Sequence, residues 1–177
     1  MNIHPLFVHF PIALLTLYAL CELLRFRRLQ ENVSWFWWKL GLLVFGTLGS
    51  FVAFHTGKMV VGSVSPADFP PLLKMHATFA TLSVQLFFTL ACLYIVSATS
   101  RGLMFQSVVP FLQRYPVSRT LWNALLFLKR LIVDSGFIVL FAIVGLVFIS
   151  ITGALGGAMV YGVDTDPFVR FIYNLLF

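Results

Sequence analysis

Residues 131–161 read LIVDSGFIVLFAIVGLVFISITGALGGAMVY, with Asp134 as the single charged side chain. A bilayer core about 30 Å thick is crossed by roughly 20 apolar residues, because a helix rises about 1.5 Å per residue. This stretch is therefore long and apolar enough to span a membrane. Three others, at about residues 6–24, 36–56 and 72–97, have the same character. The sequence predicts an all-α integral membrane four-helix bundle, forming one domain over residues 1–177.

The composition agrees with a lipid environment. Hydrophobic residues make up 60% of the chain and charged residues 10%, whereas a water-soluble domain carries roughly 25% charged residues. The net charge of +6 comes from Lys and Arg beside the apolar stretches, without an aromatic-interleaved basic surface. Membrane lipids are therefore an expected partner, and nucleic acid is not.

The basic residues indicate an orientation. Nine of the 12 fall in or beside the connections between the first and second spans and between the third and fourth. They are Arg25, Arg27, Arg28, Lys39, Arg101, Arg114, Arg119, Lys129 and Arg130. Cytoplasmic connections carry an excess of Lys and Arg. We therefore expect both termini on the opposite, outer side of the membrane.

Two segments outside the spans are amphipathic. In residues 118–130, Leu121, Leu125 and Leu128 recur at helical spacing, and Ser118 is a possible cap. Residues 167–177 have a similar pattern. Such segments are typical of helices that lie at the membrane surface or contact another subunit.

The histidines share one end of the expected bundle. His4 and His9 begin the first span, His55 ends the second and His76 begins the third. Because successive spans run in opposite directions, all four lie near the outer face. Ligating side chains at membrane depth are costly and are functional candidates by default. His9, His55 and His76 are the best candidates for axial ligands, followed by His4.

A b-type heme suits this pattern, because it needs two neutral imidazoles on facing helices and a slot lined by small residues. The second and fourth spans supply small residues, although close packing of helices is, taken alone, the better explanation of such stripes. They are Gly46, Gly49, Ser50, Ala53, Gly57, Gly145, Gly153, Gly156 and Gly157. Lys58, Lys74 and Arg170, on the same side, could neutralise heme propionates. Four histidines allow one heme b or two.

A direct metal site is the chemical alternative. His4, His9, His55 and His76 could bind copper together with Met59, Met75 and Met159, or zinc without them. Other polar residues favour structural roles: Glu22 is spaced to pair with Arg25, and Asp134 with Arg130. Cys21 and Cys92 lie in apolar spans without CxxC spacing and are expected to pack as small hydrophobic residues.

Several motifs resemble a bacterial membrane family catalogued as domain of unknown function 2231. They are HPLFVHFPIA at 4–13, HTG at 55–57, His76, TGALGG at 152–157 and YG at 161–162. The resemblance covers nearly the whole chain. It implies a four-helix protein of the bacterial inner (cytoplasmic) membrane, with histidines at one end that are suspected of binding heme.

The leading hypothesis is a membrane electron-transfer subunit, similar to a b-type cytochrome, with heme near the periplasmic face. Its partners would be a periplasmic cytochrome or a quinone, together with other membrane subunits. The alternative is a structural or assembly subunit of a respiratory or photosynthetic complex. No hydrolase or nucleotide-binding motif is present, so a redox or structural subunit is favoured over a stand-alone enzyme.

Overall fold

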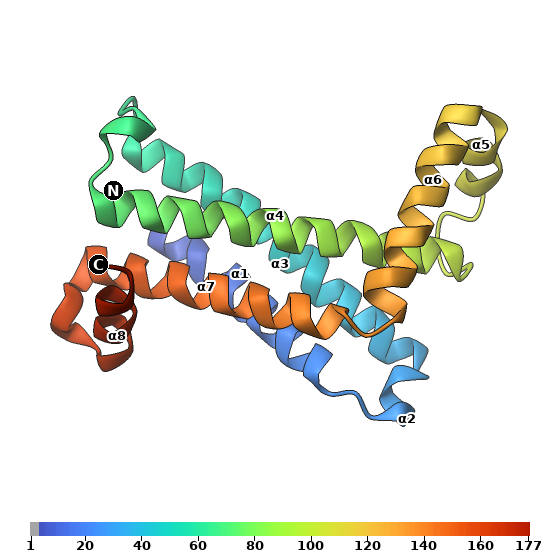
Figure 1. Cartoon of the computed structure of the whole chain (residues 1–177), viewed down its shortest axis with the longest axis horizontal. Helices are drawn as coiled ribbons and strands as arrows, with labels where there is room; N and C mark the ends of the chain where they lie inside the picture. The colour runs from blue at the N-terminus through green and yellow to red at the C-terminus, as the bar shows by residue number, and fades with distance from the viewer. Residues whose placement is uncertain (1–3) are drawn as a thin grey trace.

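The computed structural model describes residues 4–177, apart from the side chains of residues 5 and 6, and this part of the chain contains no β-strand. Four long helices lie roughly side by side in it: α1 (His4–Leu23), α3 (Val33–Val61), α4 (Pro71–Ser100) and α7 (Ile138–Tyr161) (Figure 1). We name the two ends of this bundle by what they carry. The terminal end holds the start of α1, the 3-10 turns η1 (Pro66–Asp68) and η3 (Val163–Thr165), and α8 (Pro167–Leu176). The basic end holds α2 (Arg27–Gln30), α5 (Val108–Arg114) and α6 (Pro116–Lys129).

The long helices have the character of membrane spans. In the described residues, α3, α4 and α7 are long and apolar enough to cross a bilayer, and α1 contains a shorter apolar segment, Phe7–Leu23. Large apolar side chains also point away from the core: Phe45 is 62% exposed and Leu140 is 55% exposed. Such apolar outer surface is unusual for a soluble monomer and suits contact with lipid. The prediction of an all-helical membrane protein is confirmed.

The helix bounds differ from those expected mainly before α7. The expected span began at residue 131, but residues 130–134 form a π-helical turn, η2 (Arg130–Asp134), and α7 begins only at Ile138. Gly136 separates the two elements with a φ of 92°, a left-handed conformation that glycine adopts without a steric penalty. The apolar run therefore continues across a turn that hydropathy does not detect.

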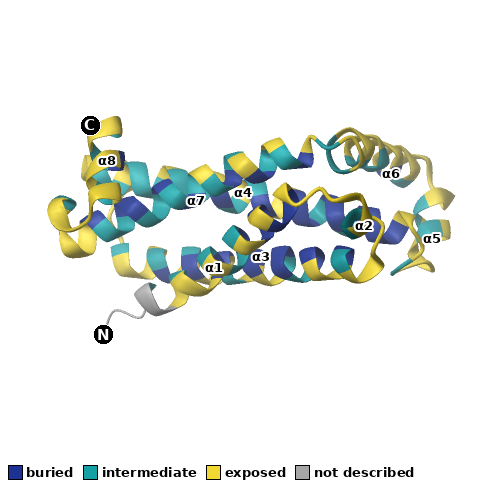
Figure 2. Ribbon diagram, turned by 90° about the horizontal axis from the view of Figure 1, so that it is seen from below, coloured by how far each residue is buried: buried dark blue, intermediate teal, exposed yellow. Residues whose placement is uncertain are grey.

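Helices α1 and α4 lie at diagonally opposite corners of the four-helix bundle. Each of these two helices packs against α3 on one side and α7 on the other. Buried residues lie on the facing sides of the long helices, while the short helices at both ends are largely exposed (Figure 2). Large side chains that are almost fully enclosed in the core include Leu15, Tyr18, Leu43, Phe87 and Leu90. Side chains on α1 and α4 thus meet across the bundle interior.

Two glycines allow neighbouring helices to approach each other closely within this core. A Cβ atom at Gly46 would lie 2.6 Å from Leu15 Cδ2, and one at Gly145 would lie 2.6 Å from Phe87 Cζ. These distances are shorter than real Cβ contacts, so α3 and α7 approach their neighbours because the side chain is absent. The helix-packing explanation of the glycine stripes therefore holds at these two positions.

The two amphipathic segments form helices α6 and α8. Helix α6 begins at Pro116, so Ser118 lies inside it and does not cap it. The Ser118 hydroxyl instead donates to the Leu112 carbonyl of α5 at 2.7 Å. Pro116 suits a first helical turn because it has no N–H to satisfy. In α8, the Asp166 carboxylate caps the helix by accepting from the Phe168 amide at 2.8 Å, and Ile172 is buried against α7 residues such as Leu155.

Candidate functional site

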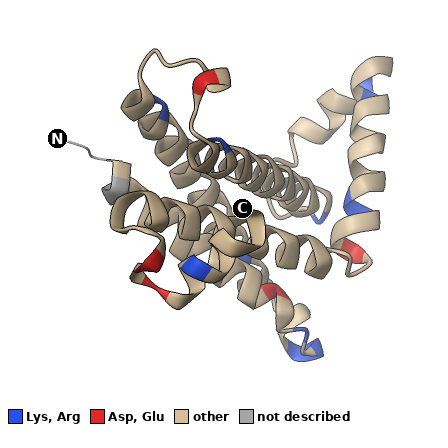
Figure 3. Ribbon diagram, turned by 60° about the vertical axis from the view of Figure 1, so that its left-hand side comes forward, with Lys and Arg blue, Asp and Glu red and all other residues tan. Residues whose placement is uncertain are grey.

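The charged residues lie towards the two ends of the bundle, and the middle of the long helices is almost free of them (Figure 3). All four histidines lie towards the terminal end, as their positions near the start of α1, the end of α3 and the start of α4 require. Their side chains differ in direction. His9 and His55 are exposed, whereas His4 and His76 are partly buried. Because α1 and α4 lie on a diagonal of the bundle, the two partly buried imidazoles come from opposite corners, with His4 contacting α3 and His76 contacting α7.

The His4 imidazole is oriented by Thr56 of α3. His4 Nδ1 lies 3.1 Å from Thr56 Oγ1, and the Thr56 hydroxyl donates its own proton to the Ala53 carbonyl at 2.9 Å. With its single proton donated to Ala53, the Thr56 hydroxyl accepts in its contact with His4. His4 therefore carries a proton on Nδ1, and in the neutral imidazole the lone pair is on Nε2.

The His76 imidazole is oriented in the same way by α7. Its Nδ1 lies 3.0 Å from the Thr152 carbonyl oxygen, which can only accept. His76 is therefore also protonated on Nδ1, with the lone pair of the neutral ring on Nε2. This is the usual arrangement of a metal-ligating histidine, in which one ring N–H donates to a carbonyl or another acceptor and the other nitrogen binds the metal.

Glycines make room for both rings. A Cβ atom at Gly57 would lie 3.2 Å from His4 Cε1, and one at Gly156 would lie 3.3 Å from His76 Cε1. These contacts would be tighter than ordinary van der Waals packing, so a larger residue would push either imidazole from its position. Two glycines of the expected stripes thus pack against the histidines rather than against a helix.

The other residues expected at this end do not all converge on the two imidazoles. Arg170 is paired with Asp164 at 2.9 Å, and Lys58 Nζ lies 4.7 Å from the centre of the Phe54 ring. Met59 is 66% exposed and Met159 40% exposed. Among residues 4–177, no group of three or more His, Cys, Asp or Glu side chains lies close enough to hold a metal ion.

The comparison with protein families agrees with the resemblance in the histidine and glycine motifs. A family model described as "Predicted membrane protein (DUF2231)" matches residues 1–166. The chain belongs to this family. No curated protein and no solved structure matches it. The matched residues include all four histidines and end at the residue that caps α8.

A second polar cluster, which the sequence patterns did not predict, lies at the basic end of this DUF2231 protein. Glu22 of α1 and Lys39 of α3 form a buried ion pair, with 3.0 Å between Oε2 and Nζ. The Tyr94 hydroxyl of α4 donates to the other Glu22 oxygen, Oε1, and Lys39 Nζ also lies 5.6 Å from the centre of the Tyr94 ring. Three helices thus meet in one network of hydrogen bonds and charges.

Both ion pairs expected from helical spacing are wrong. Glu22 pairs with Lys39 rather than Arg25, because Glu22 faces the core. Asp134 pairs with Lys129 at 2.8 Å and Arg101 at 3.6 Å rather than with Arg130, because the π turn rotates Asp134 away from the spacing of an α-helix. Charged residues inside apolar spans, at 22 and 39, were the available signal for the buried pair. Cys21 and Cys92 are free thiols, as expected.

Proposed function

We propose that this protein binds a b-type heme through His4 and His76, at the terminal end of a four-span bundle, and serves as an electron-transfer subunit of the bacterial inner membrane. The observation that carries the proposal is that Nδ1 of each ring contacts an oxygen atom of a neighbouring helix, at Thr56 and Thr152. On diagonal helices, His4 and His76 each donate Nδ1–H to an acceptor on a neighbouring helix. In both neutral rings the Nε2 lone pair is then the one suited to iron.

The residues present fit such a group. The two imidazoles come from diagonal helices at the same end of the bundle, and Gly57 and Gly156 let them lie close against α3 and α7. Heme b, when bound, supplies one-electron transfer, with a potential set by its ligands and surroundings. The chain's own contribution is to hold two imidazoles in fixed orientation. Lys74 is exposed and lies two positions before His76, which makes it the best candidate to pair with a heme propionate.

The proposed topology follows from the chain's charges. With α1 as the fourth span, the basic end carries most of the Lys and Arg residues and is the cytoplasmic end by the positive-inside rule. The histidines and both termini then lie on the periplasmic side, where a periplasmic cytochrome or a quinone could exchange electrons. Residues 101–130 contain basic but no acidic residues, and Val117 and Leu121 of α6 are 83% and 61% exposed. This composition suits a helix on the anionic inner surface.

An absorption spectrum of the purified, dithionite-reduced protein tests the heme proposal. We expect a sharp alpha band at the b-type position, which His4→Ala and His76→Ala each abolish. His9→Ala and His55→Ala are matched controls at the same end, because both side chains are exposed, and they should keep the band.

A colourless wild-type protein would exclude the heme. Elemental analysis would then separate a copper or zinc site from a structural subunit that copurifies with partners. A band lost in His55→Ala and kept in His76→Ala would instead move the ligands to the exposed histidines.

A further inference from the structure

A small polar cavity of about 40 Å³ lies at the basic end, far along the bundle from the histidines. All four long helices or their immediate ends contribute to its lining. Its polar lining residues are Glu22, Arg25, Gln30, Trp35, Lys39, Tyr94 and Arg101. A water needs roughly 10–15 Å³ of such space. The cavity therefore has room for about three waters or for one group of a few heavy atoms.

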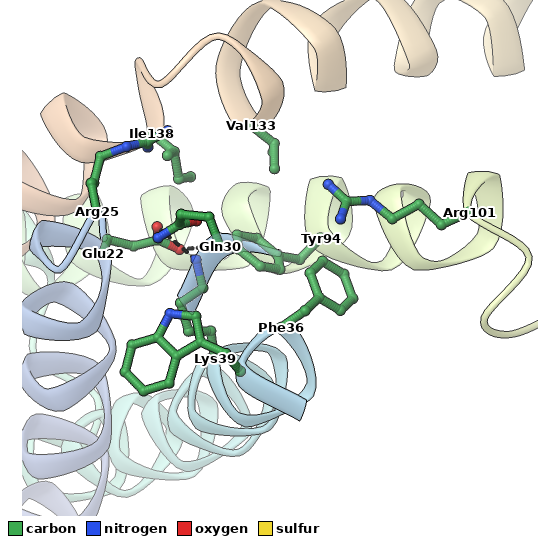
Figure 4. A pocket seen from close by; sticks show the side chains of 10 residues that line it. Glu22, Arg25, Gln30, Phe36, Lys39, Tyr94, Arg101, Val133 and Ile138 are labelled. Atoms are coloured by element: carbon green, nitrogen blue, oxygen red, sulfur yellow. Dashed lines mark hydrogen bonds and ion pairs between the residues drawn. The ribbon is translucent and has the colours of Figure 1, made fainter. Parts of the chain in front are cut away.

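The lining carries more positive than negative charge. Arg25, Lys39 and Arg101 line the cavity together with one carboxylate, that of Glu22. Arg101 extends towards the cavity from one side, and Arg25 lies on the other, near Ile138 (Figure 4). Asp134 lies 3.6 Å from Arg101 but is 2.8 Å from Lys129. When Asp134 and Lys129 are included, the group contains four positively charged side chains and two negatively charged ones.

The free hydrogen-bonding capacity of the lining is mainly that of donors. Both oxygens of Glu22 already accept, one from Lys39 and the other from Tyr94. The indole N–H of Trp35 is buried and has no hydrogen-bond partner among the described residues. A buried donor without a partner costs about 1–3 kcal/mol. A ligand that accepts hydrogen bonds would remove that cost.

The two arginines are held at the mouth of the cavity. The Arg25 guanidinium lies over the turn before α7, since a Cβ atom at Gly136 would be 3.5 Å from its Nη2. Arg101 stacks on Phe36, with 5.0 Å between its Cζ and the ring centre. Lys39 is buried and forms part of the interior. Exposed guanidinium groups at an entrance and buried donors within it suit an anion that enters from the aqueous side.

We propose that this cavity binds a phosphate group. Donors approach it from opposite sides and from different helices, so the ligand must accept in several directions. A tetrahedral phosphate does so, whereas a carboxylate presents two oxygens along one edge. Guanidinium groups also bind phosphate through paired hydrogen bonds. The phosphate could belong to a lipid headgroup or to free inorganic phosphate.

Two measurements on the full-length protein in detergent distinguish the sources. Calorimetric titration with inorganic phosphate detects a free anion, and native mass spectrometry after incubation with phosphatidylglycerol detects a bound lipid. We expect binding in at least one of them. Arg25→Gln and Trp35→Phe should each weaken that binding at least tenfold, because each removes a donor to the phosphate.

Arg27→Gln is the matched control, since it removes the same charge two residues away. The Arg27 side chain is 91% exposed and pairs with Glu31 outside the cavity. Binding that Arg27→Gln leaves unchanged and Arg25→Gln reduces would support the site, and the measurement in which it occurs identifies the source. Lack of binding in both measurements, or equal loss in Arg25→Gln and Arg27→Gln, would overturn it. Neither result depends on heme, because the histidines lie at the other end.

Discussion

Glu22 and Lys39 lie 17 positions apart on different helices, yet they form an ion pair whose side chains are only 1% and 5% exposed. The carboxylate also accepts the Tyr94 hydroxyl, so both of its oxygens are satisfied. Burying two charges is costly, and the attraction between them repays that cost only when such geometry is maintained. The pair therefore fixes how α1, α3 and α4 meet at the basic end.

Replacing one residue of the Glu22–Lys39 pair should destabilise the protein much more than replacing both. Lys39→Met leaves the Glu22 charge buried without its cation and should destabilise the protein by about 3–5 kcal/mol. Combining it with Glu22→Gln should recover most of that loss. Thermal unfolding in detergent measures both effects. The control is Arg27→Met, which breaks the exposed pair with Glu31 and should change the melting temperature little. A Lys39→Met protein as stable as wild type would contradict a structural role for the buried pair.

Two glycines on α7 should respond oppositely to the same substitution. In Gly145→Ala, the new methyl group would lie 2.6 Å from the fully buried Phe87 ring, and we expect a loss of about 1–3 kcal/mol from overpacking. At Gly153, a Cβ atom has no neighbour within 4 Å, so Gly153→Ala should be neutral or stabilising by up to about 1 kcal/mol. Equal effects on thermal unfolding would show that the Phe87 contact does not limit packing.

Two threonines test how the histidines are oriented. Thr56→Val removes the hydroxyl that accepts from His4 Nδ1, and should lower heme affinity about 10–100-fold if the proposed ligation is correct. Thr152→Val changes shape equally but keeps the main-chain carbonyl that accepts from His76, so affinity should be retained. Heme titration followed by absorbance measures both. A larger loss in Thr152→Val would argue against the proposed roles.

The proposed orientation predicts the accessibility of two exposed serines. Ser63 follows α3 at the terminal end, and Ser107 precedes α5 at the basic end. With Cys21 and Cys92 replaced by alanine, Ser63→Cys should react with a membrane-impermeant maleimide in intact spheroplasts. Ser107→Cys should react only after lysis. The reverse pattern would indicate the opposite topology. Reaction of both cysteine variants in intact spheroplasts would exclude the proposed number of spans.

Several parts of the site could be predicted and others could not. Alternation of the helices was enough to bring His4, His9, His55 and His76 to one end, because the end at which a residue lies depends only on its position along its helix. Which histidines face inward depends on rotation about the helix axis. The long helices are apolar on nearly all sides, so the sequence carries little signal of that rotation. His9 and His55 were therefore ranked above His4, which the structure turns towards the interior.

The amino-acid sequence by itself determined that this is a helical membrane protein of the DUF2231 family with its histidines at one end, because length, hydropathy and order along the chain suffice for that. Only the tertiary structure decided which side chains meet. Close approaches at Gly46 and Gly145 help to fix the packing of the helices, and that packing pairs Glu22 with Lys39, His4 with Thr56 and His76 with the Thr152 carbonyl. Partner choice across a bundle depends on these contacts between distant residues, which local spacing does not encode.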